Sequence, residues 1–149
     1  KMRNQIRWEN VVYQDGNCEA IARTNGKVVA RHKIVTVGKA VALKAVADNS
    51  DWKADGMDLQ HIRIIAVDSK GRRVPNAVAE VKVNVVGDAQ LVAMSNGNIN
   101  SDELNVTDHQ SLFNGSCLAI LRSGVASSPV IVNISAPGLK AAKLKLATK

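Results

Sequence analysis

The feature that most constrains this chain is the alternation of short β-branched runs with turn clusters between residues 51 and 149. The runs span residues 61–67, 81–86, 117–121, 130–134 and 144–146. The clusters between them span residues 69–71, 86–88, 96–98, 123–124 and 137–138. Strands that recur about every 8–12 residues with turn signals between them are typical of an all-β sandwich or barrel. The sequence therefore predicts an all-β fold and indicates no helix.

The first fifty residues form a separate block with its own turn signals. We predict strands at Trp8–Tyr13, Cys18–Thr24 and Lys27–Val37, with Asn25-Gly26 as a hairpin turn because both central residues of that turn need positive φ. Three strands are too few for an immunoglobulin-like sandwich, which needs about seven strands in about 100 residues. We therefore expect residues 1–47 to be the closing strands of a truncated immunoglobulin-like domain, a partial second β-sandwich. Residues 51–149 are then a complete one, with 40–47 as the connecting or first strand.

Composition narrows the function classes. Hydrophobic residues make up 46% of the chain but aromatic residues only 3%, so the core must be aliphatic. No run of 18 apolar residues is present, as a membrane-spanning helix would need. The net charge of +7 is concentrated in residues 1–50, which hold nine Lys/Arg against four Asp/Glu. Single-stranded nucleic-acid binding combines basic grooves with stacking aromatics, and the basic half has almost none, so we predict a solvated strand face and no nucleic-acid partner.

The two cysteines, Cys18 and Cys117, each lie in a strand-like run. We expect both to be buried free thiols, with one long-range disulfide as the alternative. No CxxC pair or His/Cys cluster with zinc-ligand spacing is present. The sequence therefore assigns neither a metal nor a cofactor.

The long stretch between Asn96 and Asn114 holds the candidate chemistry. Asp102, Glu103 and Asp108 are candidates for a hydrolytic carboxylate pair or a calcium site, but adjacent acids on a loop without EF-hand spacing favour solvated charge. His109 lies beside Asp108 and close in sequence to two hydroxyls, Ser111 and Ser116. A triad is defined by geometry and not by sequence proximity. We therefore expect a polar loop histidine and assign no catalytic residue.

Several segments carry a family resemblance. Residues 53–59, 64–71, 74–77, 113–120 and 135–139 resemble a bacterial immunoglobulin-like domain, specifically the C-terminal domain of Bacteroides-type β-galactosidases of glycoside hydrolase family two. Residues 8–16, 25–27 and 36–38 are similar to the closing strands of the domain that precedes it in that family. The resemblance implies that catalysis belongs to a separate barrel with two glutamates. No residue here matches that barrel.

The resemblance implies a non-catalytic accessory segment of a secreted, periplasmic or cell-surface hydrolase that acts on β-galactosides. Its expected partners are the other domains of the parent enzyme and glycans, with a dimer through the first strands as a further possibility. A stalk domain of a surface adhesin and a carbohydrate-binding module stay as alternatives. For a carbohydrate module, Trp52 in the polar segment 50–53 is the best stacking platform. Its alternative is packing at the domain joint, while Trp8 and Phe113 are expected in the core.

Overall fold

The structure is a computed structural model that describes residues 6–149. It contains two compact units, Lys1–Thr36 and Val37–Lys149. The described residues form ten strands and no helix, and therefore include no helix that could cross a membrane. The all-β prediction is confirmed.

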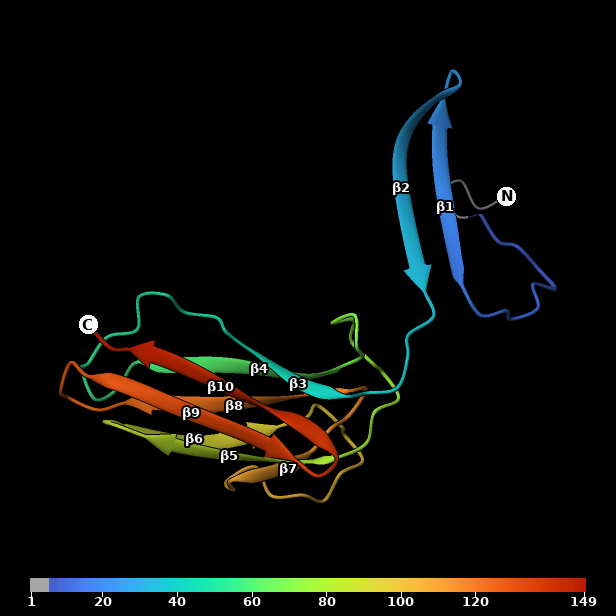
Figure 1. Cartoon of the computed structure of the whole chain (residues 1–149). Helices are drawn as coiled ribbons and strands as arrows, with labels where there is room; N and C mark the ends of the chain where they lie inside the picture. Colours follow the sequence, from blue (N-terminus) through green and yellow to red (C-terminus); the bar gives the residue numbers. More distant parts are fainter. Residues whose placement is uncertain (1–5) are drawn as a thin grey trace. The chain divides into compact units, whose positions relative to one another are not determined.

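The first unit is built on one antiparallel hairpin, β1 (Asn17–Thr24) and β2 (Lys27–Val35) (Figure 1). Its turn has φ of 50° at Asn25 and 77° at Gly26, the two positive values that the Asn-Gly pair predicted. The predicted strand at 8–13 is wrong, because that segment makes no ladder. Trp8 is 68% exposed and not a core residue.

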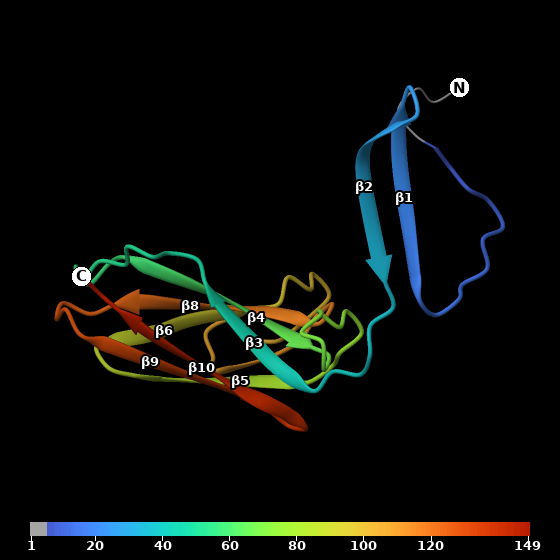
Figure 2. The ribbon, with the colours of Figure 1, turned by 45° about the horizontal axis from the view of Figure 1, so that its top comes forward.

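The second unit is a sandwich of two four-stranded layers (Figure 2). One layer has the order β6-β8-β4-β3, formed by β6 (Ala89–Ser95), β8 (Ser116–Ser123), β4 (Leu59–Val67) and β3 (Ala42–Ala47). The other has the order β10-β9-β5-β7, formed by β10 (Leu139–Ala147), β9 (Pro129–Ala136), β5 (Glu80–Val86) and β7 (His109–Ser111). A parallel pairing of Lys140 with Ala42 joins the layers along one side. This unit is an immunoglobulin-like β-sandwich.

The core lies between the layers and follows the two-residue period of the strands. Ile62, Ile64 and Ala66 of β4 face Val81 and Val83 of β5 and the alternate residues of β9 across it. Nearly every core side chain is aliphatic, as the composition predicted. Trp52 is the single aromatic side chain in the described core.

The predicted boundary between the domains needs correction. The predicted bounds placed β3 in the first domain, residues 1–47, although residues 40–47 were also expected as the connecting or first strand. β3 pairs with β4 along its whole length from Ala42 to Ala47. Leu43 of β3 is also buried in the sandwich core. Since β3 shares both its hydrogen bonds and its core contacts with the sandwich, the second unit begins at Val37. Whether the first unit closes a further sandwich stays a prediction.

Candidate functional site

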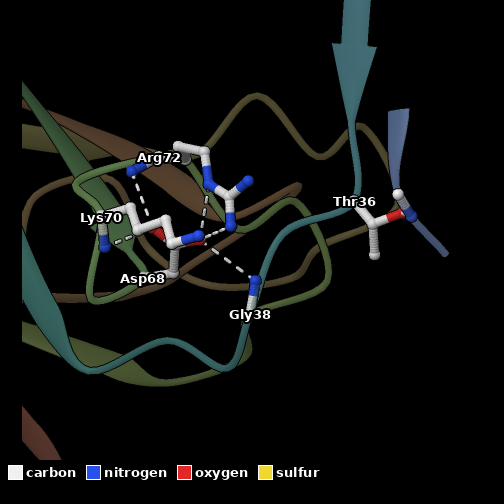
Figure 3. Close-up of polar contacts among 6 residues, drawn as sticks. Thr36, Gly38, Asp68, Lys70 and Arg72 are labelled. Carbon is white, nitrogen blue, oxygen red and sulfur yellow. Dashed lines mark hydrogen bonds and ion pairs between the residues drawn. The ribbon is translucent and has the colours of Figure 1, made fainter. Parts of the chain in front are cut away.

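A buried polar site of the second unit is built around Asp68, directly after β4. Its Oδ1 accepts hydrogen bonds from the backbone N–H groups of Lys70 and Arg72, each at 2.9 Å (Figure 3). Its Oδ2 accepts from Arg72 Nε at 2.8 Å and from the backbone N–H of Gly38 at 3.1 Å. Arg72 Nη2 lies 2.7 Å from the same oxygen. The carboxylate thus fastens the first residues of the unit to the turn after β4.

The chemistry of this site is that of a fixed anion. Hydrogen bonding from the Arg72 guanidinium lowers the pKa of Asp68 most, and the three backbone N–H groups lower it further against the opposing effect of burial. A carboxyl group held so strongly ionised has no proton to give, so it cannot act as a general acid. Sequence reasoning recognised only a turn at 69–71. The Asp-x-x-Gly pattern of Asp68 and Gly71, typical of a type I turn, was the available signal.

Glu103 is the centre of a second polar site, within the segment that was predicted as a solvated loop. Its Oε2 accepts from Asn96 Nδ2 at 3.1 Å, Ser101 Oγ at 2.9 Å and Gln110 Nε2 at 2.9 Å. Its Oε1 accepts from the Ser111 N–H at 2.9 Å. Hydrogen bonding from Ser111 is the largest cause that lowers the pKa of Glu103, and desolvation opposes it. The solvated-charge expectation is therefore wrong for this residue, which fixes the loop against the edge of the sandwich.

Asp108 and His109 form an exposed hydrogen-bonded pair. Asp108 Oδ1 lies 2.8 Å from His109 Nδ1, and its Oδ2 lies 3.3 Å from Lys82 Nζ. The hydrogen bond between Asp108 and His109 lowers the pKa of Asp108 and raises the pKa of His109. Exposed pairs of this kind contribute little to stability. Asp102 is exposed as expected.

The structure does not assemble a triad around His109. Its Nδ1 contacts Asp108 and, at 3.0 Å, Thr107 Oγ1. The backbone N–H of Ser111 is bound to Glu103, and Ser116 Oγ lies 3.1 Å from Arg73 Nη2. Within residues 6–149 no hydrogen bond joins the histidine to either serine, and no group of three or more His, Cys, Asp or Glu side chains is placed to hold a metal ion.

Trp52 is buried, with 1% of its surface exposed, and belongs to the core of the sandwich. Its Nε1 donates a hydrogen bond of 3.0 Å to the Asp58 carbonyl oxygen. A sugar-stacking platform needs an open ring face, so the prediction of Trp52 as a carbohydrate contact is wrong. The indole packs in the core of the second unit.

The two cysteines differ from each other. Cys117 is a buried thiol whose pKa burial raises to about 12, which keeps it unreactive. Cys18 is exposed on β1, so its predicted burial is wrong. Phe113 is 38% exposed and not a core residue either.

The fold and these sites define an immunoglobulin-like module whose ionised side chains fasten turns and loops. The family model for the glycoside hydrolase family 2 C-terminal domain 5 matches residues 43–145. The chain belongs to this family.

The sequence relatives are glycoside hydrolases. A β-galactosidase of Bacteroides ovatus is 31% identical over 144 residues, which cover 97% of this chain and 17% of the relative. A β-glucuronidase of Formosa agariphila is 28% identical over 139 residues, which cover 91% of this chain and 14% of the relative. The chain therefore spans about a sixth of the length of the relatives it matches.

Solved structures agree with these relatives. A glycosyl hydrolase family 2 member from Bacteroides cellulosilyticus matches with a TM-score of 0.90 and 32% identity, over 93% of this chain and 18% of that one. A β-glucuronidase from glycoside hydrolase family 2 matches with a TM-score of 0.86 and 26% identity, over 95% of this chain and 15% of that one. Both matches confirm the family that the sequence resembled.

Proposed function

We propose that this chain is a non-catalytic structural segment of a longer family 2 glycoside hydrolase, whose other domains hydrolyse β-galactosides. The proposal is supported by relatives that extend far beyond the part this chain matches. A segment of this kind contributes packing surface to the enzyme, and its rigid sandwich suits that task.

The observation that carries the proposal is the protonation state of the carboxyl groups. Glycoside hydrolysis needs one carboxyl with a raised pKa to protonate the leaving group. Every carboxyl with a shifted pKa in the described residues is shifted downward by hydrogen bonds: Asp55, Asp68, Glu103 and Asp108. Each is therefore ionised at neutral pH and serves structure better than acid catalysis.

A second candidate activity for the parent enzyme is hydrolysis of β-glucuronides. It is favoured by the Formosa agariphila relative and by the β-glucuronidase structure with a TM-score of 0.86. Sugar specificity belongs to the catalytic domain, so this chain favours neither substrate by itself.

Enzyme assays test the proposal directly. The purified chain is expected to release no product from chromogenic β-galactosides or β-glucuronides, whereas the full-length product of its gene should hydrolyse one of them. Turnover by the isolated chain that survives repurification and disappears in Asp102→Ala, Glu103→Ala or Asp108→Ala would overturn the non-catalytic assignment. A full-length product that lacks a family 2 barrel would overturn the parent assignment.

We also propose that β1 and β2 pack against a further β-sheet, as the closing strands of a preceding sandwich. Every residue of both strands is exposed, and an isolated two-stranded hairpin is only marginally stable in water. A periplasmic, extracellular or cell-surface location of the parent enzyme stays a prediction, which fractionation of the native bacterium would test.

A further inference from the structure

The first unit ends in a residue that is tied to its own hairpin. Thr36 follows β2 directly, and its backbone N–H donates a hydrogen bond of 2.8 Å to the Gly16 carbonyl oxygen. Its Oγ1 accepts the Gly16 N–H at 3.1 Å and lies 3.3 Å from the Tyr13 hydroxyl oxygen. The same hydroxyl donates to Asp15 Oδ1 at 2.7 Å. Thr36 is therefore held by the first unit through its backbone and its side chain.

The second unit takes hold of the chain two residues later, at Gly38. The backbone N–H of Gly38 donates to Asp68 Oδ2 at 3.1 Å (Figure 3). Asp68 is only 3% exposed, and two backbone N–H groups of the turn after β4 fix its other oxygen. A hydrogen bond to an ionised acceptor is among the stronger ones in a protein. Gly38 is therefore held by the sandwich.

The chain stays attached to the sandwich beyond that point. Ala40 packs against the core cluster. The backbone N–H of Val41 donates to the Val67 carbonyl oxygen, and its own carbonyl accepts the Lys140 N–H, both at 2.9 Å. Lys39 forms no hydrogen bond among the described residues, but both of its neighbours are fixed to the same unit.

Val37 is the one residue between the two points of attachment. Within residues 6–149 it forms no hydrogen bond, whereas the residue on each side of it does. The boundary between the two compact units falls directly before it. Hinges are loop or element-terminal residues that absorb changes in φ and ψ. Because each residue has only these two soft backbone dihedrals, the free part of this connection is a single pair of angles.

We propose that Val37 is a one-residue hinge between the two units, and that the hydrogen bond from Gly38 to Asp68 keeps the hinge this short. Domains joined in one chain move relative to each other by default, and here such motion is confined to φ and ψ of Val37. Asp68 is a positioning residue for the hinge. Without its Oδ2 the free segment would extend through Gly38 and Lys39, and glycine is the most permissive residue that could be released. The hinge does not depend on which sugar the parent enzyme accepts.

Residual dipolar couplings of the backbone N–H groups test the position of the hinge in the chain of 149 residues. Rotation about φ and ψ of Val37 leaves its own N–H with the first unit and that of Gly38 with the second. We therefore expect the couplings of Gly38 and Lys39 to fit the alignment tensor of the sandwich, and those of Thr36 and Val37 to fit that of the hairpin. Couplings of Gly38 that do not fit the sandwich would overturn the proposal by showing a longer tether. Couplings of Thr36 that fit the sandwich would show one rigid body, and couplings that fit neither unit would show that Thr36 is not held; either result would also overturn it.

Asp68→Asn tests the role of the carboxylate. Its amide oxygen can still accept the two backbone N–H groups of the turn after β4, whereas the NH2 group in place of Oδ2 cannot accept from Gly38. We expect the couplings of Gly38 and Lys39 to leave the tensor of the sandwich. Hydrogen exchange of the Gly38 amide should become at least about tenfold faster, because a bond to a charged acceptor is lost.

Arg72→Ala is the matched control, because it removes the guanidinium but leaves both carboxylate oxygens, so Gly38 should stay with the sandwich. If Asp68→Asn does not fold, Gly38→Pro removes only the donor and should release Lys39 in the same way. An unchanged Gly38 in folded Asp68→Asn, an unchanged Lys39 in folded Gly38→Pro, or equal loosening in Arg72→Ala would overturn the role of Asp68.

Discussion

Replacing Trp52 by alanine should strongly destabilise the second unit. A buried aromatic side chain hides about 150–250 Å², and at roughly 25 cal/mol per Å² this corresponds to about 4–6 kcal/mol. That figure is an upper bound, because the unfolded chain already hides part of the surface. The lost Nε1 hydrogen bond adds little, since the Asp58 carbonyl still accepts from the Ser123 N–H at 3.0 Å. We expect about 4 kcal/mol, within the range of about 3–5 kcal/mol for such substitutions.

Urea unfolding followed by circular dichroism measures this change without relying on tryptophan fluorescence. Trp8→Ala is the matched control, because Trp8 is 68% exposed against 1% for Trp52. It should change the free energy of unfolding by less than about 0.5 kcal/mol. A Trp52→Ala protein within about 1 kcal/mol of the parent chain would refute the assignment of this indole to the core. Galactoside binding that Trp52→Ala abolishes without loss of stability would restore the role of Trp52 as a carbohydrate platform.

Three further predictions concern the loop at Glu103, the stability of the chain at acidic pH, and the hairpin of β1 and β2. Glu103→Ala should lower the free energy of unfolding in urea by about 2–3 kcal/mol, because it removes charge-assisted hydrogen bonds. Asp102→Ala, at the exposed neighbouring residue, should leave that free energy nearly unchanged. Equal effects of the two substitutions would contradict the anchoring role of Glu103. The folded pKa of Glu103 lies below its ordinary value of 4.5, so its stabilisation is present above that pH and is lost as the pH falls through the folded pKa. The free energy of unfolding, measured from pH 7 to pH 3, should therefore decline less steeply in Glu103→Gln than in the unsubstituted chain. Parallel declines in the two proteins would count against this role of Glu103. Self-association of the isolated chain through β1 and β2 should strengthen as salt screens the basic excess of the first fifty residues. Light scattering that shows a monomer at every salt concentration, together with hydrogen exchange that shows a mobile hairpin, would exclude this self-association.

The strands of the sandwich could be predicted where local pattern and tertiary structure agree. The runs 61–67 and 130–134 became β4 and β9 because β-branched side chains suit a pleated surface with one buried face. β6 was missed, although the turns at 86–88 and 96–98 bracket it. Residues 8–13 were predicted as a strand but pair with no strand among the described residues.

The surroundings of Glu103 and Trp52 were beyond sequence reasoning for a different reason. Glu103 is fixed by donors from Asn96, Gln110 and Ser111, and nothing in the local pattern shows that these side chains meet. Trp52 lies in a polar segment, yet the fold turns its ring into the core. Exposure of single side chains in loops depends on tertiary contacts, so the two residues with the most chemical interest were the ones most easily misjudged.

Four carboxylates of this module share one structural use, which bears on how substitutions in the whole enzyme are interpreted. Asp55 Oδ1 accepts the N–H groups of Met57 and Asp58, at 2.8 and 2.7 Å, and Asp88 Oδ2 accepts that of Ala126 at 2.7 Å. Asp68 and Glu103 do the same for other turns. In the hydrolase proposed above, alanine at any of these positions should lower activity only by loosening a loop and so unfolding this segment. Such a loss should follow the fraction of folded protein and recover at lower temperature. A catalytic carboxylate would instead lower kcat in a fully folded enzyme and change its pH profile, so the two cases are separable by measuring activity and folding on the same sample.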